Sequence, residues 1–328
     1  MRARVFVTRR IPDEGLQPIL EQCDARVWEA ELPPDPDAVR QAVRGVQGLL
    51  CLLSDPVDES VMEAAGPSLR VISVMAVGYD HVDVAAATRR GILVTHTPGA
   101  LTDTTADLAF ALMLAAARRI PEGVDFVRSG RWRTWDPLLL LGEDVHGATL
   151  GIVGMGRIGQ AVARRARGFE MRVLYFNRSR VEFEGAERCE RLLDLLRESD
   201  FVSLHLPGSA ENRRLIDRDA FAAMKPNAIL INTARGSLVD TEALVEALKT
   251  HRIRAAALDV TDPEPLPADH PLLALPNCVV VPHIGSASRV TRARIARLAA
   301  ENLLQALAGR RPPHPVNPEV LGRLHESP

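Results

Sequence analysis

Three ionisable residues lie just after apolar, strand-like segments in the C-terminal half of the chain. Arg235 follows a buried-looking strand, Glu264 lies between Pro263 and Pro265, and His283 ends an apolar run. A guanidinium can clamp a carboxylate through two parallel hydrogen bonds. An imidazole titrates near neutral pH and can give a proton to a carbonyl, and a carboxylate partner keeps it charged and oriented. The three residue types together therefore predict acid–base chemistry on a small acid.

Each of these residues also has a structural interpretation. Arg235 could form a salt bridge, Glu264 could be a solvated carboxylate on a rigid turn, and a lone histidine such as His283 is more often structural. Of the nine histidines, His283 has the best context, and His205 also ends a strand. Ligands gather at the carboxyl ends of strands in open α/β sheets. The order of arginine, glutamate and histidine after successive strands therefore favours chemistry.

A glycine motif stands upstream of these residues. Gly154-Met155-Gly156-Arg157-Ile158-Gly159 follows the apolar strand Leu150–Val153 and opens the helix Ile158–Arg167. Glycines allow a tight turn and a close backbone approach to a pyrophosphate, and the helix N-terminus offers free N–H groups. A glycine-rich turn without a ligand is the alternative. The strand–turn–helix setting favours a dinucleotide site.

The segment after the next strand predicts which dinucleotide binds. NAD enzymes carry an acidic residue near this point to hold the ribose 2′-hydroxyl. This chain has Asn177-Arg178-Ser179-Arg180 instead. Arginines suit a 2′-phosphate, which an acidic side chain would repel. We therefore predict that NADP(H) is preferred and that NAD(H) is possible, unless these arginines are only solvated loop residues.

Short β-branched runs alternate with helical patterns along the whole chain, which predicts an α/β fold with two doubly wound parallel-sheet domains. The final helix, Val290–Leu307, is expected to return to the first domain and make it discontinuous. The predicted strands are Arg4–Thr8, Ala25–Trp28, Gly48–Leu53, Arg70–Met75, Ile92–Thr95, Thr149–Val153, Arg172–Phe176, Phe201–His205, Ala228–Asn232, Ala255–Val260 and Val279–Pro282.

A long helix and an irregular segment separate the two strand series. The helix is predicted over Thr102–Arg119, with Pro121 just past its end. The segment Ser129–Gly147 holds Trp132, Trp135 and an apolar run. Apolar residues on a loop predict burial against another surface, such as a second subunit.

Composition limits the classes of function. The 328 residues carry a formal net charge of −2, with 46% hydrophobic and 25% charged residues, so no electrostatic footprint for nucleic acid or an acidic membrane is present. The four cysteines are scattered, which predicts no zinc site, no other metal and no disulfide framework. The N-terminus runs straight into a strand, and no apolar run reaches membrane-spanning length. We therefore expect a cytoplasmic protein with reduced thiols.

The chain resembles the D-2-hydroxyacid dehydrogenases over essentially its whole length. The likeness is carried by the glycine motif, Arg235-Gly236, the segment from Asp259 to Pro265, and Pro282-His283-Ile284-Gly285-Ser286. It is closest to the glyoxylate/hydroxypyruvate reductase branch. Longer matches there include Gly48–Asp55 and Leu101–Ala106.

The resemblance implies a flavodoxin-like substrate domain over residues 1–100 and 290–328. It implies a Rossmann domain over residues 101–289, with a dimer arm around residues 120–147 and a cleft between the domains. The catalytic residues would be Arg235, Glu264 and His283. The substrate site would be lined by Leu53, Val77, Gly78, Arg235, His283, Ser286 and Trp135, the last from a partner subunit. The cofactor site would comprise Thr105, Gly154, Gly156, Arg157, Ile158, Gly159, Asn177, Arg178, Ser179, Arg180, His205, Thr233, Asp259 and Gly285.

The activity implied by the resemblance is NADPH-dependent reduction of glyoxylate or hydroxypyruvate to glycolate or D-glycerate in a homodimer. His283 would donate the proton while C2 of the substrate receives a hydride. The alternatives are another 2-hydroxyacid dehydrogenase, acting on phosphoglycerate, lactate or phosphite, or a dinucleotide-sensing protein like the family's transcriptional corepressors. A Rossmann-type methyltransferase would leave the histidine, glutamate and arginine unexplained.

Overall fold

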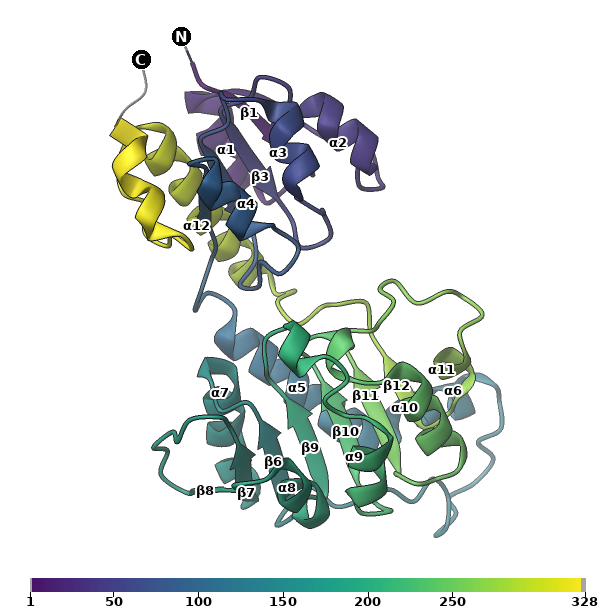
Figure 1. Ribbon diagram of the computed structural model, residues 1–328. Coiled ribbons are helices and arrows are strands. Elements are labelled where there is room, and N and C mark those ends of the chain that lie inside the picture. The colour runs from purple at the N-terminus through teal and green to yellow at the C-terminus, as the bar shows by residue number, and fades with distance from the viewer. Residues whose placement is uncertain (1, 326–328) are drawn as a thin grey trace. The chain divides into compact units, whose positions relative to one another are not determined.

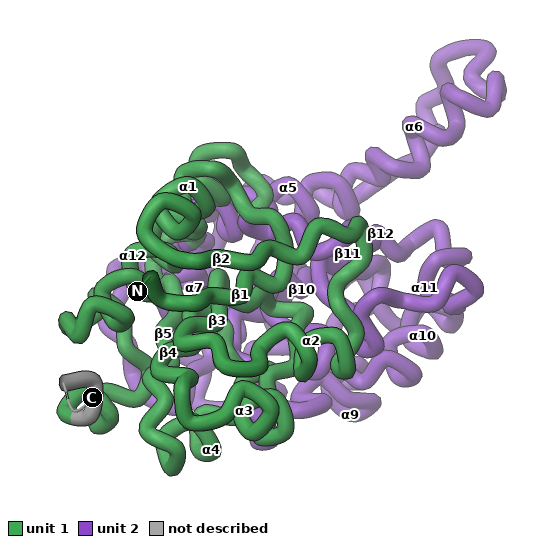
Figure 2. Tube along the Cα trace, turned by 90° about the horizontal axis from the view of Figure 1, so that it is seen from above, with its two compact units in different colours: residues 1–101, 287–328 green, residues 102–286 purple. Residues whose placement is uncertain are grey.

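The computed structural model describes residues 2–325, which form two compact units (Figures 1 and 2). Among these residues, unit 1 comprises 2–101 and 287–325, and unit 2 comprises Thr102–Ser286. No helix among the described residues is both long and apolar enough to cross a membrane.

Unit 1 is built on a five-stranded parallel sheet with the strand order β2-β1-β3-β4-β5. This is the flavodoxin-like order. All strands except the edge strand β2 are almost wholly buried, because helices cover both faces of the sheet. The strands are β1 (Arg4–Val7), β2 (Asp24–Val27), β3 (Gly48–Cys51), β4 (Val71–Val74) and β5 (Leu93–Thr95).

In the described part of unit 1, five α-helices make the outer layers. The cores on the two faces of the sheet show that α1 and α12 cover one face, and that α2, α3 and α4 cover the other. Aspartates cap α2, α3 and α4, each accepting from a backbone N–H in the first turn. The helices are α1 (Asp13–Gln22), α2 (Pro36–Ala42), α3 (Glu59–Ala65), α4 (Val84–Arg89) and α12 (Arg289–Leu307), and the 3₁₀ helix η4 spans Pro318–His325.

Unit 2 contains a seven-stranded parallel sheet with the order β12-β11-β10-β9-β6-β7-β8. If β6 is counted as the first strand of the unit, the strands from β11 to β8 have the Rossmann order, and β12 is one added edge strand. The direction of the strand order reverses between β6 and β9. The strands are β6 (Thr149–Val153), β7 (Arg172–Phe176), β8 (Ala186–Arg188), β9 (Phe201–Leu204), β10 (Ile229–Asn232), β11 (Ala255–Leu258) and β12 (Cys278–Val280).

The helices of unit 2 also form two layers. Helices α5 and α7 share a core on one face of the sheet, and α8 to α11 share a core on the other. The helices are α5 (Thr102–Ala117), α6 (Ile120–Arg128), α7 (Arg157–Ala166), α8 (Leu192–Glu198), α9 (Arg218–Ala223), α10 (Thr241–Lys249) and α11 (Pro271–Ala274), with 3₁₀ turns η1 (Arg167–Phe169), η2 (Ala210–Asn212) and η3 (Gly236–Leu238).

Two parallel-sheet α/β units confirm the predicted fold class. Several predicted boundaries differ from the structure by one or two residues; β3, for example, ends at Cys51 rather than Leu53. The helix expected to reach Arg119 ends at Ala117, because Arg119 adopts a left-handed φ of 52°. Pro121 then lies in the first turn of α6 rather than after the last helix residue, a position that tolerates proline because no N–H is needed there. The strand β8 and the helix α1 were not predicted.

Candidate active site

The glycine turn joins β6 to α7, and close packing requires two of its glycines. Gly154 has a φ of 103°, and a Cβ there would lie 2.8 Å from the carbonyl group of His205. At Gly159 a Cβ would lie 2.2 Å from the carbonyl oxygen of Gly154. Gly156 is the N-cap of α7, and a Cβ there would meet nothing within 4 Å. The first turn therefore has uncapped N–H groups, open space and no acidic residue, which suits a phosphate.

Two buried polar atoms near this turn have no hydrogen-bond partner among the described residues. They are Nδ1 of His205, just after β9, and Oγ1 of Thr233, just after β10. Burial lowers the pKa of His205 to about 3, so its ring is neutral, and Nε2 lies 2.9 Å from Oγ of Ser203. Because β10, β9 and β6 are neighbours, both atoms lie on the edge that carries the glycine turn. A buried polar atom without a partner is unusual, and these two fit the hydroxyl and amide groups of a dinucleotide.

The segment after β7 carries the residues that would discriminate between dinucleotides. The Asn177 side chain donates to the carbonyl oxygen and the hydroxyl of Ser179, at 3.0 and 3.3 Å. Arg178 forms an ion pair of 2.6 Å with Glu211, which sequence reasoning missed, and both side chains are about three-quarters exposed. The pairing joins the segment after β7 to the 3₁₀ turn η2, 33 residues away in the chain, so no local sequence signal could have revealed it. Arg180 is exposed.

His283 and Glu264 form a short polar contact beyond the end of β12. Nδ1 of His283 lies 2.6 Å from Oε1 of Glu264, and the backbone N–H of Thr261 donates to Oε2 at 3.3 Å. Burial raises the pKa of Glu264, but the hydrogen bond and charge of His283, the Thr261 N–H and the charge of Arg235 outweigh burial, and the pKa is lowered overall. Because the carboxylate can only accept, Nδ1 carries the proton and Nε2 is the ring nitrogen left for a substrate.

A buried carboxylate fixes the backbone around His283. Asp259 follows β11 and accepts from the N–H groups of Ile284 and Gly285 at 2.6 and 2.8 Å. The His283 N–H donates to the Asp259 carbonyl at 3.0 Å. His283 has a left-handed φ of 51°, which costs free energy and persists only where neighbours hold it. Thr105, in the first turn of α5, donates to the Gly285 carbonyl at 3.2 Å.

The hydrogen bonds from Ile284 and Gly285 give Asp259 a structural role in addition to the cofactor-binding role that the resemblance implies. Burial raises the pKa of Asp259, and the Ile284 N–H, the charge of His283 and the Gly285 N–H partly oppose that rise. Both carboxylate oxygens accept from the loop after β12. The Asp259 side chain therefore holds in place the loop after β12 that carries His283.

Arg235 lies on the loop that follows β10, next to the loop after β11 that carries Glu264. A Cβ on Gly236 would lie 2.0 Å from the carbonyl group of Thr261, so the two loops touch through their main chains. The guanidinium donates to the Ala234 carbonyl at 2.7 Å, and its charge contributes to the lowered pKa of Glu264. Since β10, β11 and β12 are adjacent in the sheet, Arg235, Glu264 and His283 converge at one edge of unit 2.

The predicted substrate residues Leu53, Val77 and Gly78 belong to unit 1, on the loops after β3 and β4. The N–H groups of Val77 and Gly78 have no hydrogen-bond acceptor within residues 2–325. A carboxylate oxygen would satisfy such donors. Ser286, the last residue of unit 2, is partly buried.

Comparison with known proteins identifies the family. A family model described as the NAD binding domain of D-isomer specific 2-hydroxyacid dehydrogenases matches residues 110–285. The glyoxylate reductase of Korarchaeum cryptofilum is 52% identical over 326 residues, covering 98% of both chains. The chain belongs to the D-isomer specific 2-hydroxyacid dehydrogenase family.

Further relatives of this dehydrogenase support the same assignment. The glyoxylate reductase of Thermococcus litoralis is 47% identical over 328 residues, covering 98% of each chain. A crystal structure from Thermus thermophilus is 52% identical, with a TM-score of 0.91 over 95% of this chain and 99% of that one. An NADPH-dependent glyoxylate/hydroxypyruvate reductase from Sinorhizobium meliloti, solved with NADP and malonate, is 34% identical, with a TM-score of 0.83 over 96% and 97% of the two chains. The protein is therefore a 2-hydroxyacid dehydrogenase that uses a nicotinamide dinucleotide.

The dehydrogenase carries a projecting arm on unit 2. Helix α6 and the segment after it extend away from the rest of that unit (Figure 2). Trp135 is 79% exposed and Trp132 is 61% exposed, and Leu138 and Leu141 are exposed beside them. So much apolar surface on an extended segment is typical of an interface.

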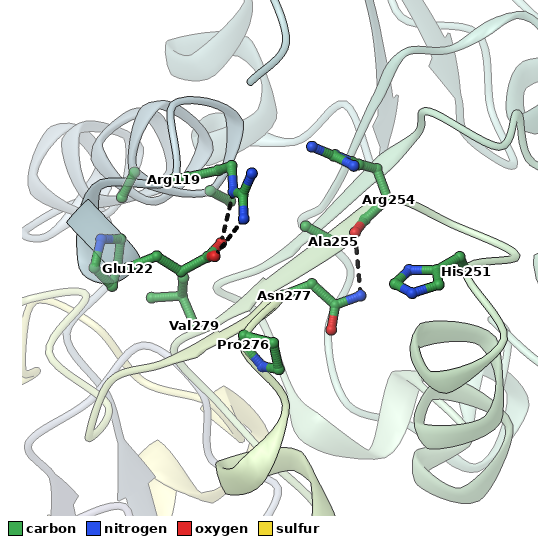
Figure 3. A pocket seen from close by; sticks show the side chains of 11 residues that line it. Arg119, Glu122, His251, Arg254, Ala255, Pro276, Asn277 and Val279 are labelled. Atoms are coloured by element: carbon green, nitrogen blue, oxygen red, sulfur yellow. Dashed lines mark hydrogen bonds and ion pairs between the residues drawn. The ribbon is translucent and has the colours of Figure 1, made fainter. Parts of the chain in front are cut away.

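A hollow lies at the root of this arm (Figure 3). It encloses about 110 Å³ and is lined in part by Arg119, Glu122, Arg254 and Asn277. Arg119 pairs with Glu122 at 2.6 Å, and the Asn277 side chain donates to the Arg254 carbonyl at 3.2 Å. These residues adjoin the N-terminal ends of β11 and β12, whereas the catalytic side chains follow the C-terminal ends. The hollow is thus at the wrong edge of the sheet for the chemistry.

Proposed function

We propose that this dehydrogenase reduces glyoxylate and hydroxypyruvate to glycolate and D-glycerate, with NADPH preferred to NADH. The proposal rests on the 2.6 Å His283–Glu264 pair, which lies on the sheet edge that also carries Arg235 and the glycine turn. The curated relatives named above are glyoxylate reductases, and the Sinorhizobium meliloti reductase is NADPH-dependent. These names support the choice of substrate and cofactor.

His283 supplies the proton of the reduction. Glu264 stays ionised because its pKa is lowered, and it holds Nδ1–H so that Nε2 faces the substrate. When bound, the reduced nicotinamide supplies the hydride that C2 of the keto acid receives. The carbonyl oxygen takes the Nε2 proton at the same stage, so a ketone, one hydride and one proton become a secondary alcohol. For glyoxylate, an aldehyde becomes a primary alcohol in the same way. Solvent then returns a proton to Nε2.

Arg235 anchors and polarises the substrate. A guanidinium beside the carboxylate and the 2-oxygen stabilises negative charge as it develops on that oxygen. The N–H groups of Val77 and Gly78 bind the other side of the carboxylate, with Leu53 and Ser286 lining the site. The proposed substrate contacts thus come from residues of both units, whereas the proposed cofactor contacts all come from unit 2.

The preference for NADPH follows from the segment after β7. Asn177 is neutral where an acidic residue would repel a 2′-phosphate, and Arg178 and Arg180 would attract one. The ion pair between Arg178 and Glu211 is largely exposed and such pairs contribute little. A phosphate dianion can therefore take Arg178 away from Glu211.

The arm is proposed to pair with a second copy of this chain as a homodimer. Its exposed tryptophans and leucines would then be buried, and Trp135 of the partner subunit would reach the substrate site.

A substrate panel tests the proposed function. Initial rates with glyoxylate, hydroxypyruvate, pyruvate and phosphohydroxypyruvate, each with NADPH and NADH, give kcat/KM for every pair, and the oxidation of phosphite is assayed with NADP and NAD. Highest values for glyoxylate or hydroxypyruvate with NADPH support the proposal. Highest values for another substrate assign that substrate instead, and cofactor binding without turnover would favour a dinucleotide-sensing protein.

A further inference from the structure

His96 lies beside the loop that carries Val77 and Gly78. The residue follows β5, and β5 pairs in parallel with β4, whose C-terminal end leads into that loop. Residues that follow neighbouring parallel strands emerge at the same edge of the sheet. The fold of unit 1 therefore brings the His96 side chain to the loop without any help from unit 2.

Two successive carbonyl groups of the loop are held from this position. Nδ1 of His96 lies 2.8 Å from the carbonyl oxygen of Val77, and the N–H of Thr97 donates to the carbonyl oxygen of Ala76 at 2.9 Å. A carbonyl oxygen can only accept, so Nδ1 of His96 carries the proton.

These two contacts fix the directions of two N–H groups. A peptide unit is planar and trans, so its N–H points opposite to its C=O. The Val77 carbonyl and the Gly78 N–H belong to one peptide unit, and the Ala76 carbonyl and the Val77 N–H belong to the unit before it. Holding both carbonyls on one side therefore presents both N–H groups on the other, where no described residue accepts from them.

The His96 main chain and ring are both held within unit 1. The backbone carbonyl of His96 accepts from the Asn302 side chain at 2.8 Å, and the backbone N–H of His96 donates to the His314 carbonyl at 3.2 Å. The ring of Tyr79 meets the imidazole edge-on, with centroids 5.2 Å apart and planes at 87°. The His96 ring thus contacts Val77 and Tyr79, the residues that precede and follow Gly78.

We propose that His96 is a positioning residue for substrate carboxylate binding, acting through the Val77–Gly78 peptide unit. The inference rests on the proposed function, in which that peptide unit contacts the keto acid. Loss of the His96 hydrogen bond would let the peptide unit rotate, which weakens binding of the carboxylate without touching the proton donor. The expected signature is a change in KM with little change in kcat.

Two variants of His96 separate positioning from mere packing. The amide nitrogen of asparagine can occupy the place of Nδ1, so His96→Asn keeps a donor, whereas His96→Leu removes it. We expect His96→Leu to raise the KM for glyoxylate and the dissociation constant of oxamate, a carboxylate analogue, by about tenfold, the effect of losing one hydrogen bond. His96→Asn should bring both values back to within about threefold of wild type. The kcat and the NADPH dissociation constant should stay near wild type in both variants.

The control is His146→Leu, since His146 is an exposed histidine on unit 2 that pairs with the exposed Glu170. It should leave KM unchanged. An unchanged KM and oxamate affinity in His96→Leu would overturn the inference, as would His96→Asn behaving like His96→Leu with an equally lowered thermal midpoint. If the wild-type enzyme reduces no 2-keto acid, the proposed function fails, and oxamate binding to the variants still tests the role of His96.

Discussion

The proton donor and its carboxylate partner are the residues on which the proposed chemistry depends most. His283 donates Nδ1–H to Glu264, and Nε2 remains for the substrate. We expect His283→Ala to lower kcat by about 10²–10⁴-fold, the usual contribution of a general acid. The dissociation constant of NADPH, measured by fluorescence titration, should stay near wild type.

His251→Ala is the matched control, because His251 lies at the opposite edge of the sheet, at the root of the arm. This variant should keep kcat within about twofold. A His283→Ala enzyme that retains most of its kcat would remove the imidazole from the chemistry.

His205 gives a prediction about stability and pH. Burial lowers its pKa from 6.5 to about 3 in the folded chain. Between these values the unfolded chain binds a proton that the folded chain does not, so stability falls as pH drops from 6.5 toward 3. In His205→Gln the contribution is absent, so the thermal midpoint should fall less steeply than in wild type between about pH 7 and pH 5. Parallel midpoint curves for the two proteins would contradict a neutral, buried His205.

At the scale of single residues, the sequence predicts that the catalytic side chains lie close together, but it does not predict all the hydrogen bonds that hold them in place. Arg235, Glu264 and His283 could be grouped because each follows a strand, and the strands proved to be adjacent. The contacts of Asp259 with Ile284 and Gly285 could not be foreseen, because they depend on a left-handed backbone at His283. Non-glycine residues adopt that conformation only under tertiary constraint.

The loops after β10 and β11 form the element that brings arginine and glutamate together. A Cβ on Gly236 would lie 2.0 Å from the Thr261 carbonyl group, so Gly236→Ala must push the loops apart. We expect a loss of roughly 1–3 kcal/mol in the free energy of unfolding, as for overpacked sites. The kcat/KM should fall as well, because Arg235 and Glu264 separate.

Gly168→Ala is the matched control for that change. A Cβ on Gly168 would have no atom within 4 Å, and its backbone is not left-handed. The alanine there should be neutral or slightly stabilising, since it restricts the unfolded chain. Equal behaviour of the two alanine variants in thermal unfolding and activity would show that the loop contact is unimportant.

Physical reasons explain why helix α1 and strand β8 were not predicted. Helix α1 contains Pro18 in its interior, where proline normally breaks a helix. Packing on α12 compensates: Leu16 and Ile19 are buried, and Gly15 comes so close to Ala296 that a Cβ would lie 2.4 Å from its carbonyl oxygen. Strand β8 is short and lies at a sheet edge, and its residues, Ala186 to Arg188, are polar or partly buried. Its sequence lacks the apolar pattern of the central strands, so only the pairing with β7 defines it.

At the scale of the molecule, the arm on unit 2 predicts the oligomeric state. Leu138 and Trp135 are both more than 70% exposed, and a charge at this surface would be buried without a partner in a dimer. We expect Leu138→Asp to convert a dimer to a monomer in sedimentation velocity. It should also raise the KM for glyoxylate, if Trp135 of the partner subunit lines the substrate site.

Leu32→Asp is the control, because Leu32 is similarly exposed but belongs to unit 1. It should sediment as wild type does. A wild-type protein that sediments as a monomer at assay concentrations would contradict the proposed role of the arm.

The most direct measurement is the oxidation of NADPH and NADH by the wild-type enzyme with glyoxylate, followed at the absorbance of the reduced nicotinamide. We predict turnover that requires His283. The kcat/KM should be at least about tenfold higher with NADPH than with NADH, the gain expected from one or two charge-assisted hydrogen bonds to a 2′-phosphate. A rate no greater than that of His283→Ala with either cofactor would contradict the proposed reaction. Faster turnover with NADH would contradict the role given to Asn177 and Arg178.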